Sequence, residues 1–198
     1  MDNIKGISMK LKYRVSILAV VIIVFITMIS CMSCSVKPVK ECPEDLTVEF
    51  YWTTPPLSPE YNYYYGIIVG PGLQGLFEYQ PGYPDTSWEP LSPDVWEVSF
   101  EVSQDQADHL YQLLIENDLF KRRWQTTDEV AEGGSSSSIK IIANGKKYDK
   151  IPGDSEIKPE DRKNVDTVSR YLREMVPTNI WEEMQELQSQ FEKSYIDE

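Results

Sequence analysis

An apolar run near the start of the chain separates residues 1–30 from whatever fold the rest adopts. Three lysines and one arginine come first, and Val15–Ile29 then holds only two polar residues, Ser16 and Thr27. A basic head, an apolar run and a closing small residue form the pattern of a secretory signal. We therefore expect residues 1–30 to direct the protein out of the cytoplasm, and the fold to lie in the remainder of the chain.

The end of this run resembles the lipobox of bacterial lipoproteins, in which a small residue precedes the cysteine that receives a lipid. Met28-Ile29-Ser30-Cys31 fits at its last three positions and departs at Met28, where the family usually has leucine. The resemblance implies a signal peptide over 1–30 and a diacylglyceryl thioether on Cys31 with an acylated amino group. Such palmitate-like chains would anchor the protein to the membrane. Cys34, which ends Cys31-Met32-Ser33-Cys34, is the second candidate.

The alternative is an uncleaved anchor helix. The apolar run is shorter than the roughly 20 residues that span the hydrocarbon core, although Ser30, Cys31 and Met32 could extend it. The basic head still predicts that the body lies outside. Both interpretations place the protein in the cell envelope, membrane-anchored, with its domain on the extracytoplasmic side.

The charge of the body limits its partners. Without residues 1–30 the chain keeps 15 Lys and Arg against 31 Asp and Glu, a net charge of −16, compared with −13 for the whole chain. So acidic a body is repelled by phosphate backbones and by anionic headgroups. We expect no nucleic acid partner, and attachment to the membrane through the lipid on Cys31 and not through surface charge.

The rest of the chain divides into a tether and one domain. Residues 31–45 contain Pro38 and Pro43 without periodicity and are typical of a tether, whereas residues 46–198 are long enough for a single packed domain. Five Trp and twelve Tyr favour a folded core over disorder. Cys34 and Cys42 could form a disulfide in an oxidising compartment, and a free or lipidated Cys34 is the open alternative.

Alternating apolar and polar residues predict four strands. The alternation is clearest in Leu46–Trp52 and Trp96–Val102, and the runs Tyr61–Val69 and Leu73–Tyr79 flank the turn Gly70-Pro71-Gly72. A one-residue slip of the 96–102 strand would bury two carboxylates, so its register is strongly specified.

Helices are predicted from their end signals. Ser103 and Gln106 form a capping box that starts a helix ending near Asn117. Pro159 opens a second helix, which ends before Pro177, and Thr178 caps a last helix that begins near residue 179.

The dipeptide Asn144-Gly145 predicts a two-residue hairpin between the runs 139–143 and 146–151. This turn would pair Ile141 with Tyr148 and Lys140 with Asp149, an apolar pair and an oppositely charged pair. The order of strands, helix, hairpin and helices predicts an α+β fold. In it an antiparallel sheet, made of a meander and a C-terminal hairpin, is packed by about three helices.

Residues for catalysis are scarce. His109 is the only histidine and lies off the apolar stripe of its predicted helix, and no G-x-S-x-G element accompanies it. The acidic residues at 128–132 and 154–156 match no calcium-loop spacing, and the cysteines and the lone histidine do not suffice for zinc. We therefore predict no catalytic residue, no metal site and no cofactor.

Four residues are candidates for binding. Tyr83 and Trp88 lie in the loop Gln80–Pro93, which four prolines stiffen, and aromatic residues on such loops are typical of contacts with proteins or glycans. Arg122 and Arg123 belong to the one basic cluster of the body, which either complements the end of the preceding helix or docks an acidic group.

The segment from Ser103 to Phe120, together with the strand at Ile139, resembles small secreted bacterial domains, some of them related to the protease inhibitor emfourin. The likeness covers about half of the body, and the Gly-Ser loop 133–138 and the last helix depart from it. It implies protease inhibition as the alternative to our main hypothesis, a non-enzymatic binding or interaction module for an envelope or extracellular protein or glycan. A hydrolase that uses only carboxylates is the third hypothesis.

Overall fold

The computed structural model describes residues 40–54, 58, 61–82, 95–120, 124, 135–151 and 157–196. These residues all lie in one compact unit. Its architecture is α+β, as the sequence predicts: a six-stranded antiparallel sheet and three helices.

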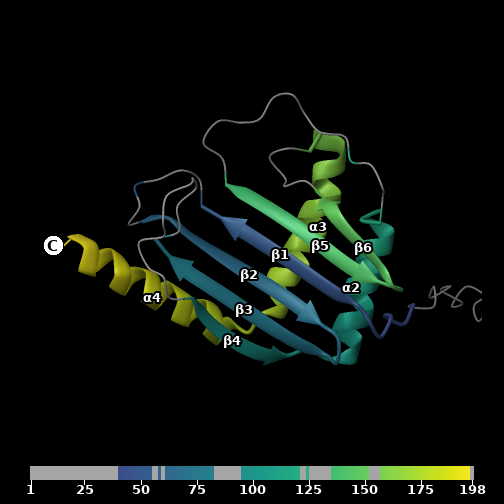
Figure 1. Cartoon of the computed structure of the whole chain (residues 1–198), viewed down its shortest axis with the longest axis horizontal. Helices are drawn as coiled ribbons and strands as arrows, with labels where there is room; N and C mark the ends of the chain where they lie inside the picture. Colours follow the sequence, from purple (N-terminus) through teal and green to yellow (C-terminus); the bar gives the residue numbers. More distant parts are fainter. Residues whose placement is uncertain are drawn as a thin grey trace, which may run out of the picture. The chain divides into compact units, whose positions relative to one another are not determined.

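The sheet consists of a meander extended by a hairpin (Figure 1). Its strands are β1 (Thr47–Thr53), β2 (Tyr63–Gly70), β3 (Gln74–Pro81), β4 (Trp96–Glu101), β5 (Ser136–Ala143) and β6 (Lys146–Ile151). They lie in the order β4-β3-β2-β1-β5-β6, so β1 is paired with both β2 and β5. The meander β1–β4 and the hairpin β5–β6 confirm the predicted sheet.

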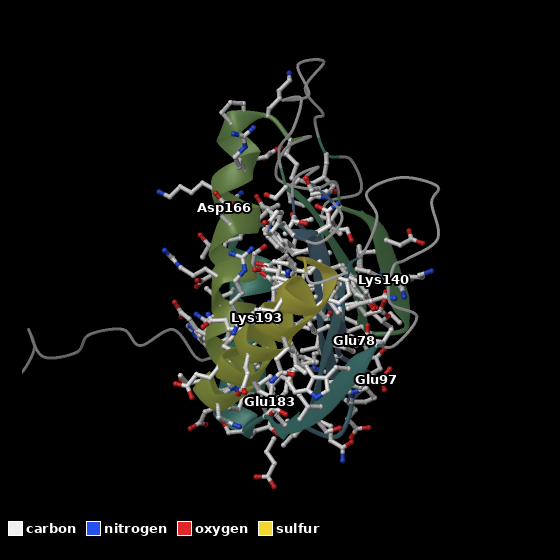
Figure 2. All side chains as sticks on the ribbon, turned by 90° about the vertical axis from the view of Figure 1, so that its left-hand side faces the viewer. Glu78, Glu97, Lys140, Asp166, Glu183 and Lys193 are labelled. Atoms are coloured by element: carbon white, nitrogen blue, oxygen red, sulfur yellow. The ribbon has the colours of Figure 1, made fainter. Side chains whose placement is uncertain are left out.

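The three helices are α2 (Gln104–Glu116), α3 (Pro159–Met175) and α4 (Thr178–Ile196). They lie on the same side of the sheet (Figures 1 and 2). Side chains from this side form one hydrophobic cluster, in which Phe50, Ile67 and Phe77 of the central strands are fully buried. Leu110 of α2 and Leu172 of α3 are fully buried in the same cluster. This burial holds the helices on the sheet.

The predicted ends of α2 and the predicted start of α3 are confirmed, whereas Thr178, predicted to cap the last helix, is the first residue of α4. The Ser103 Oγ accepts a hydrogen bond from the backbone N–H of Gln106 at 3.2 Å, and the Gln106 Oε1 accepts one from the backbone N–H of Ser103 at 2.9 Å. Helix α2 ends at the cap residue Asn117, and Pro159 is the first residue of α3. The connection between α3 and α4 is short: Val176 has an extended backbone, and α4 begins two residues later.

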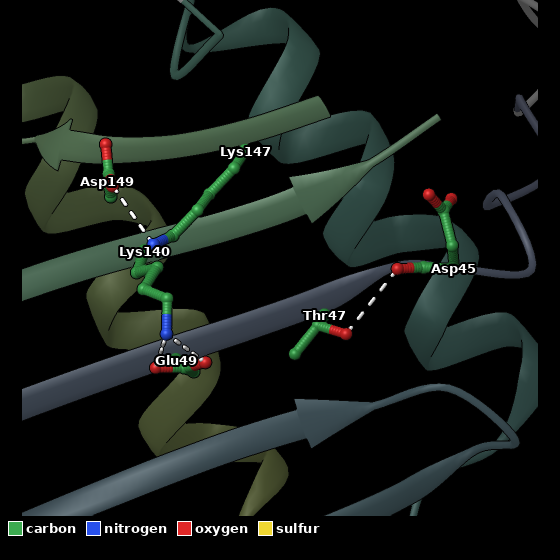
Figure 3. A network of polar contacts seen from close by, with 6 residues as sticks. All are labelled: Asp45, Thr47, Glu49, Lys140, Lys147 and Asp149. Atoms are coloured by element: carbon green, nitrogen blue, oxygen red, sulfur yellow. Dashed lines mark hydrogen bonds and ion pairs between the residues drawn. The ribbon is translucent and has the colours of Figure 1, made fainter. Parts of the chain in front are cut away.

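One prediction for the hairpin is correct and one is wrong. Ile141 pairs with Tyr148, but the ladder is irregular between Ile139 and Ile141, so Lys140 has no regular partner at Asp149. The Lys140 Nζ instead lies 2.6 Å from both carboxylate oxygens of Glu49, which faces it from β1 (Figure 3). Lys140 lies on β5, which pairs with β1 on one side and β6 on the other. The hairpin rule considers only the pairing with β6.

Residues at the N-terminal end of the unit attach to it before the first strand starts. The backbone N–H of Cys42 donates to Asp108 Oδ1 of α2 at 2.8 Å, and Leu46 is buried in the core. The last residues of the predicted tether therefore contact the folded part of the chain.

Candidate functional site

The candidate site residues from the sequence cannot be placed. Cys31, Tyr83, Trp88, Arg122 and Arg123 all lie outside the residues that the structure describes. Their roles in lipidation and binding stay predictions.

A different group of aromatic residues lines a hollow on the helix side of the sheet. Helices α3 and α4 run in different directions from their junction (Figure 1), and the residues that line the hollow come from these two helices and from β1 and β2. The hollow has a volume of about 450 Å³ and is wide open. We call it the aromatic hollow, and its lining residues are Trp52, Tyr63, Tyr65, Arg173, Trp181, Met184 and Gln185.

The rings of the aromatic hollow brace one another. Trp52 of β1 stacks on Tyr65 of β2, with ring centres 5.2 Å apart and an angle of 25° between the planes. Trp181 of α4 meets Tyr65 edge to face at 5.1 Å, and its Nε1 donates to the backbone carbonyl of Arg173 at 3.2 Å. Tyr63 lies 5.6 Å from Trp52. Such contacts fix the orientation of the rings relative to one another.

The rings that line the aromatic hollow differ in their exposure to solvent. Only 6% of Tyr65 is exposed, whereas Trp52, Tyr63 and Trp181 are half-buried. Half-buried tryptophans and tyrosines on a rigid framework offer a large apolar contact area at little cost in conformational entropy.

Arg173 is the charged residue of the aromatic hollow. Its Nε donates to the Tyr65 hydroxyl at 2.9 Å, and its guanidinium carbon lies 5.2 Å from the centre of the Phe50 ring. Within the described part of the chain, no residue accepts a hydrogen bond from its Nη atoms and no carboxylate forms an ion pair with it. The contacts with Tyr65 and Phe50 therefore orient the guanidinium, and its Nη groups have no acceptor among the described residues.

The tyrosines beside the hollow are neutral. Burial, and next the charge of Glu192, raise the pKa of Tyr63. Burial also raises the pKa of Tyr79, whose hydroxyl donates to Gln188 of α4 behind the hollow. Neutral phenols can donate and accept hydrogen bonds. The carboxylate of Glu192 is close enough to both tyrosines for its charge to raise their pKa.

A second hollow of about 320 Å³ lies where the chain enters the unit. Cys42, Pro43, Leu46 and Gly72 are among its lining residues. The Cys42 thiol is free, and burial raises its pKa. A thiol with a raised pKa is a weak nucleophile, so Cys42 is not a candidate for nucleophilic catalysis.

The helix-free side of the sheet carries a pair of carboxylates. Glu78 of β3 faces Glu97 of β4 directly across the strands, and Lys140 lies on the same side of the sheet (Figure 2). Burial raises the pKa of Glu78, and the charges of Glu97 and Glu49 add to the effect. Burial also raises the pKa of Tyr51 to about 12. A hydrolase built on carboxylates needs such a pair inside a pocket, and neither of the two hollows contains one.

His109 lies on the exposed side of α2, with its ring 4.8 Å from that of Tyr171. Among the described residues, no group of three or more His, Cys, Asp or Glu side chains is arranged to hold a metal ion. No helix in that part of the chain is both long and apolar enough to cross a membrane.

The sequence did not reveal the aromatic hollow. Trp52 fits its strand pattern, which indicates only a half-buried strand and no site. Trp181 and Gln185 are four positions apart and therefore share one face of the predicted last helix, and this spacing was the available signal. Nothing in the sequence indicated Arg173, because its neighbours come from other elements.

Comparison with models of known protein families gives no match, and neither does comparison with curated proteins. The resemblances to lipoproteins and to emfourin-like domains therefore stay predictions.

Proposed function

We propose that the protein is a lipid-anchored binding module of the cell envelope, without enzymatic activity, and that the aromatic hollow is its ligand site. The lipid on Cys31 would attach it to the membrane with the domain on the extracytoplasmic side. The observation that carries the proposal is the braced, half-exposed ring set of Trp52, Tyr63 and Trp181. Pockets of about 300–1,000 Å³ with apolar walls and a few polar groups are the usual form of small-ligand sites.

The other two hypotheses have less support. Protease inhibition would use the loop Gln80–Pro93, of which the structure describes only residues 80–82. Hydrolysis would use paired carboxylates in a pocket, and the pair Glu78 and Glu97 lies on a sheet face instead.

Site-specific photocrosslinking in intact cells tests the proposal. A photoreactive amino acid at Gln185, an exposed residue on the rim of the aromatic hollow, should give a covalent adduct with the ligand. The same amino acid at Glu116, an exposed position on α2, is the control and should not give that adduct. Trp181→Ala should abolish the adduct at 185, because it removes one wall of the site. An adduct that forms equally at 185 and 116, or at neither, contradicts the proposal.

A further inference from the structure

We propose that the aromatic hollow binds a sugar ring that carries a carboxylate, and that Arg173 recognises this carboxylate. This inference rests on the proposed function and adds the chemical class of the ligand to it. It combines three observations: the partly exposed aromatic rings, a guanidinium beside them that has no ion pair in the described part of the chain, and the position of the hollow over central strands.

The ring faces suit a sugar better than most other partners. An aromatic face carries partial negative charge, which attracts the slightly positive C–H groups on one side of a sugar ring. Trp52, Tyr63 and Trp181 are partly exposed aromatic residues that line the hollow, and Gln185 adds an amide for hydroxyl groups. The volume of about 450 Å³ suits one or two rings of a glycan chain that continues into solvent through the wide opening.

An extended peptide is the less suitable occupant. Peptides often bind by adding a strand to a free sheet edge, where backbone groups lack partners. The hollow lies over β1 and β2, and both strands are already paired on each side: β1 with β2 and β5, β2 with β1 and β3. Side chains alone would have to hold the peptide there.

Arg173 supplies the charge selectivity. The described ion pairs, Lys140 with Glu49 and Lys147 with Asp149, lie away from the hollow. Arg173 has no such partner in the described part of the chain, although acidic residues outnumber basic ones about two to one in the body. Its planar fork matches a carboxylate, and the contacts with Tyr65 and Phe50 orient it in advance. A singly charged carboxylate is also repelled less by the acidic body than a doubly charged phosphate.

Binding of matched sugars to the full-length lipoprotein in detergent micelles tests the inference. The probes are oligosaccharides of hexuronate, the same oligosaccharides with each carboxylate reduced to an alcohol, and a hexose 6-phosphate. Calorimetry should show that the hexuronate binds roughly tenfold to a hundredfold more tightly than its reduced form, the range for a hydrogen-bonded charge pair. The preference should shrink with added salt.

Variants assign the preference to one side chain. Arg173→Gln should bind the acidic and the reduced sugar equally, and retained binding of the reduced sugar shows that the site is still folded. Arg170→Gln removes the same charge from an exposed position one turn earlier on α3 and should keep the preference. Should Arg173→Gln fail to fold, Arg173→Lys serves instead, because it keeps the charge, loses the fork and should reduce the preference.

The outcomes separate the two proposals. Equal binding of both sugars that Trp181→Ala abolishes would overturn the carboxylate inference and leave the proposed function intact. Tighter binding of the sugar phosphate would overturn it in the same way. No binding of any probe, while the adduct at position 185 persists, would exclude sugars and keep the site. If no probe binds and no adduct forms at position 185, both proposals are overturned.

Discussion

Gly75 of β3 faces Phe100 of β4 across the strands, on the helix side of the sheet. A Cβ atom at this position would overlap the Phe100 ring. The ring can therefore lie flat against the backbone of β3 only because residue 75 has no side chain, and this contact buries Phe100 almost completely.

We expect Gly75→Ala to destabilise the unit by about 1–3 kcal/mol, the usual range for overpacking a core. The Phe100 ring, which is 8% exposed, would have to move. Urea denaturation followed by tryptophan fluorescence measures the effect.

Gly70→Ala is the matched control. The nearest atom to a Cβ at residue 70 is the backbone oxygen of Gln74, at an ordinary 3.8 Å. This alanine restricts the unfolded chain without a clash, so it should leave the stability unchanged or raise it by up to about 1 kcal/mol. Equal effects of the two substitutions would show that the Phe100 contact is not what requires glycine at 75.

At the scale of elements, the β5–β6 hairpin is fastened to the segment that precedes β1. Asn144 and Gly145 have positive φ angles of 53° and 68°, as the predicted two-residue turn requires. The carboxylate of Asp45 accepts hydrogen bonds from both of their backbone N–H groups, at 2.8 Å and 2.6 Å. These bonds, first the one from Gly145, lower the pKa of Asp45 below its ordinary value of 3.8.

Asp45→Asn should therefore lower the stability in a pH-dependent way. A lowered folded-state pKa means that the aspartate stabilises the fold above the unfolded-state pKa, near 3.8, and loses this contribution as the pH falls through the folded value. The melting temperature of the variant should lie below that of the wild type at pH 7, and the two should converge toward pH 2. Thermal unfolding followed by circular dichroism at several pH values measures this difference.

Glu44→Gln provides the comparison for this prediction. It removes the same charge from an exposed position one residue earlier, and at pH 7 it should change the stability by no more than about 0.5 kcal/mol. A constant difference between wild type and Asp45→Asn over the whole pH range would mean that the carboxylate charge does not hold the turn.

The elements themselves were predictable because their signals are local. The alternation in Trp96–Val102, the box of Ser103 with Gln106 and the Asn144-Gly145 turn each depend on residues close in sequence, and all three features are present. The contacts between elements were not predictable in this way. Lys140 bonds to Glu49, 91 positions away.

The aromatic hollow is the clearest example of contacts between elements that the sequence does not predict. It exists because α3 and α4 diverge at Val176, so that Trp181 and Arg173, eight positions apart, meet over Tyr65. A sequence pattern gives the buried side of each helix but not the angle between two helices. The candidate residues that it did suggest were the aromatic and basic residues of loops, which attract notice by composition alone.

At the scale of the whole molecule, charge and attachment must be explained together. The body has a net charge of −16, and anionic headgroups repel it. A single acyl chain binds a membrane only marginally, at about 0.8 kcal/mol per buried methylene, so stable attachment takes more than one chain. The diacylglyceryl group and amide-linked chain implied by the lipobox would meet this need without help from the surface of the protein.

We therefore predict that the lipid is on Cys31. Cells grown with a palmitate analogue that carries a clickable tag should label the wild-type protein, and Cys31→Ala should abolish the label. Cys34→Ala, three residues later, should keep it, because the sequence before Cys34 has a cysteine where the lipobox needs an apolar residue. Gel fluorescence after coupling a dye to the tag measures the label.

Label lost only in Cys34→Ala would mean that the lipid is on Cys34. An unlabelled wild-type protein that still sediments with membranes would show instead that residues 15–32 act as an uncleaved anchor helix.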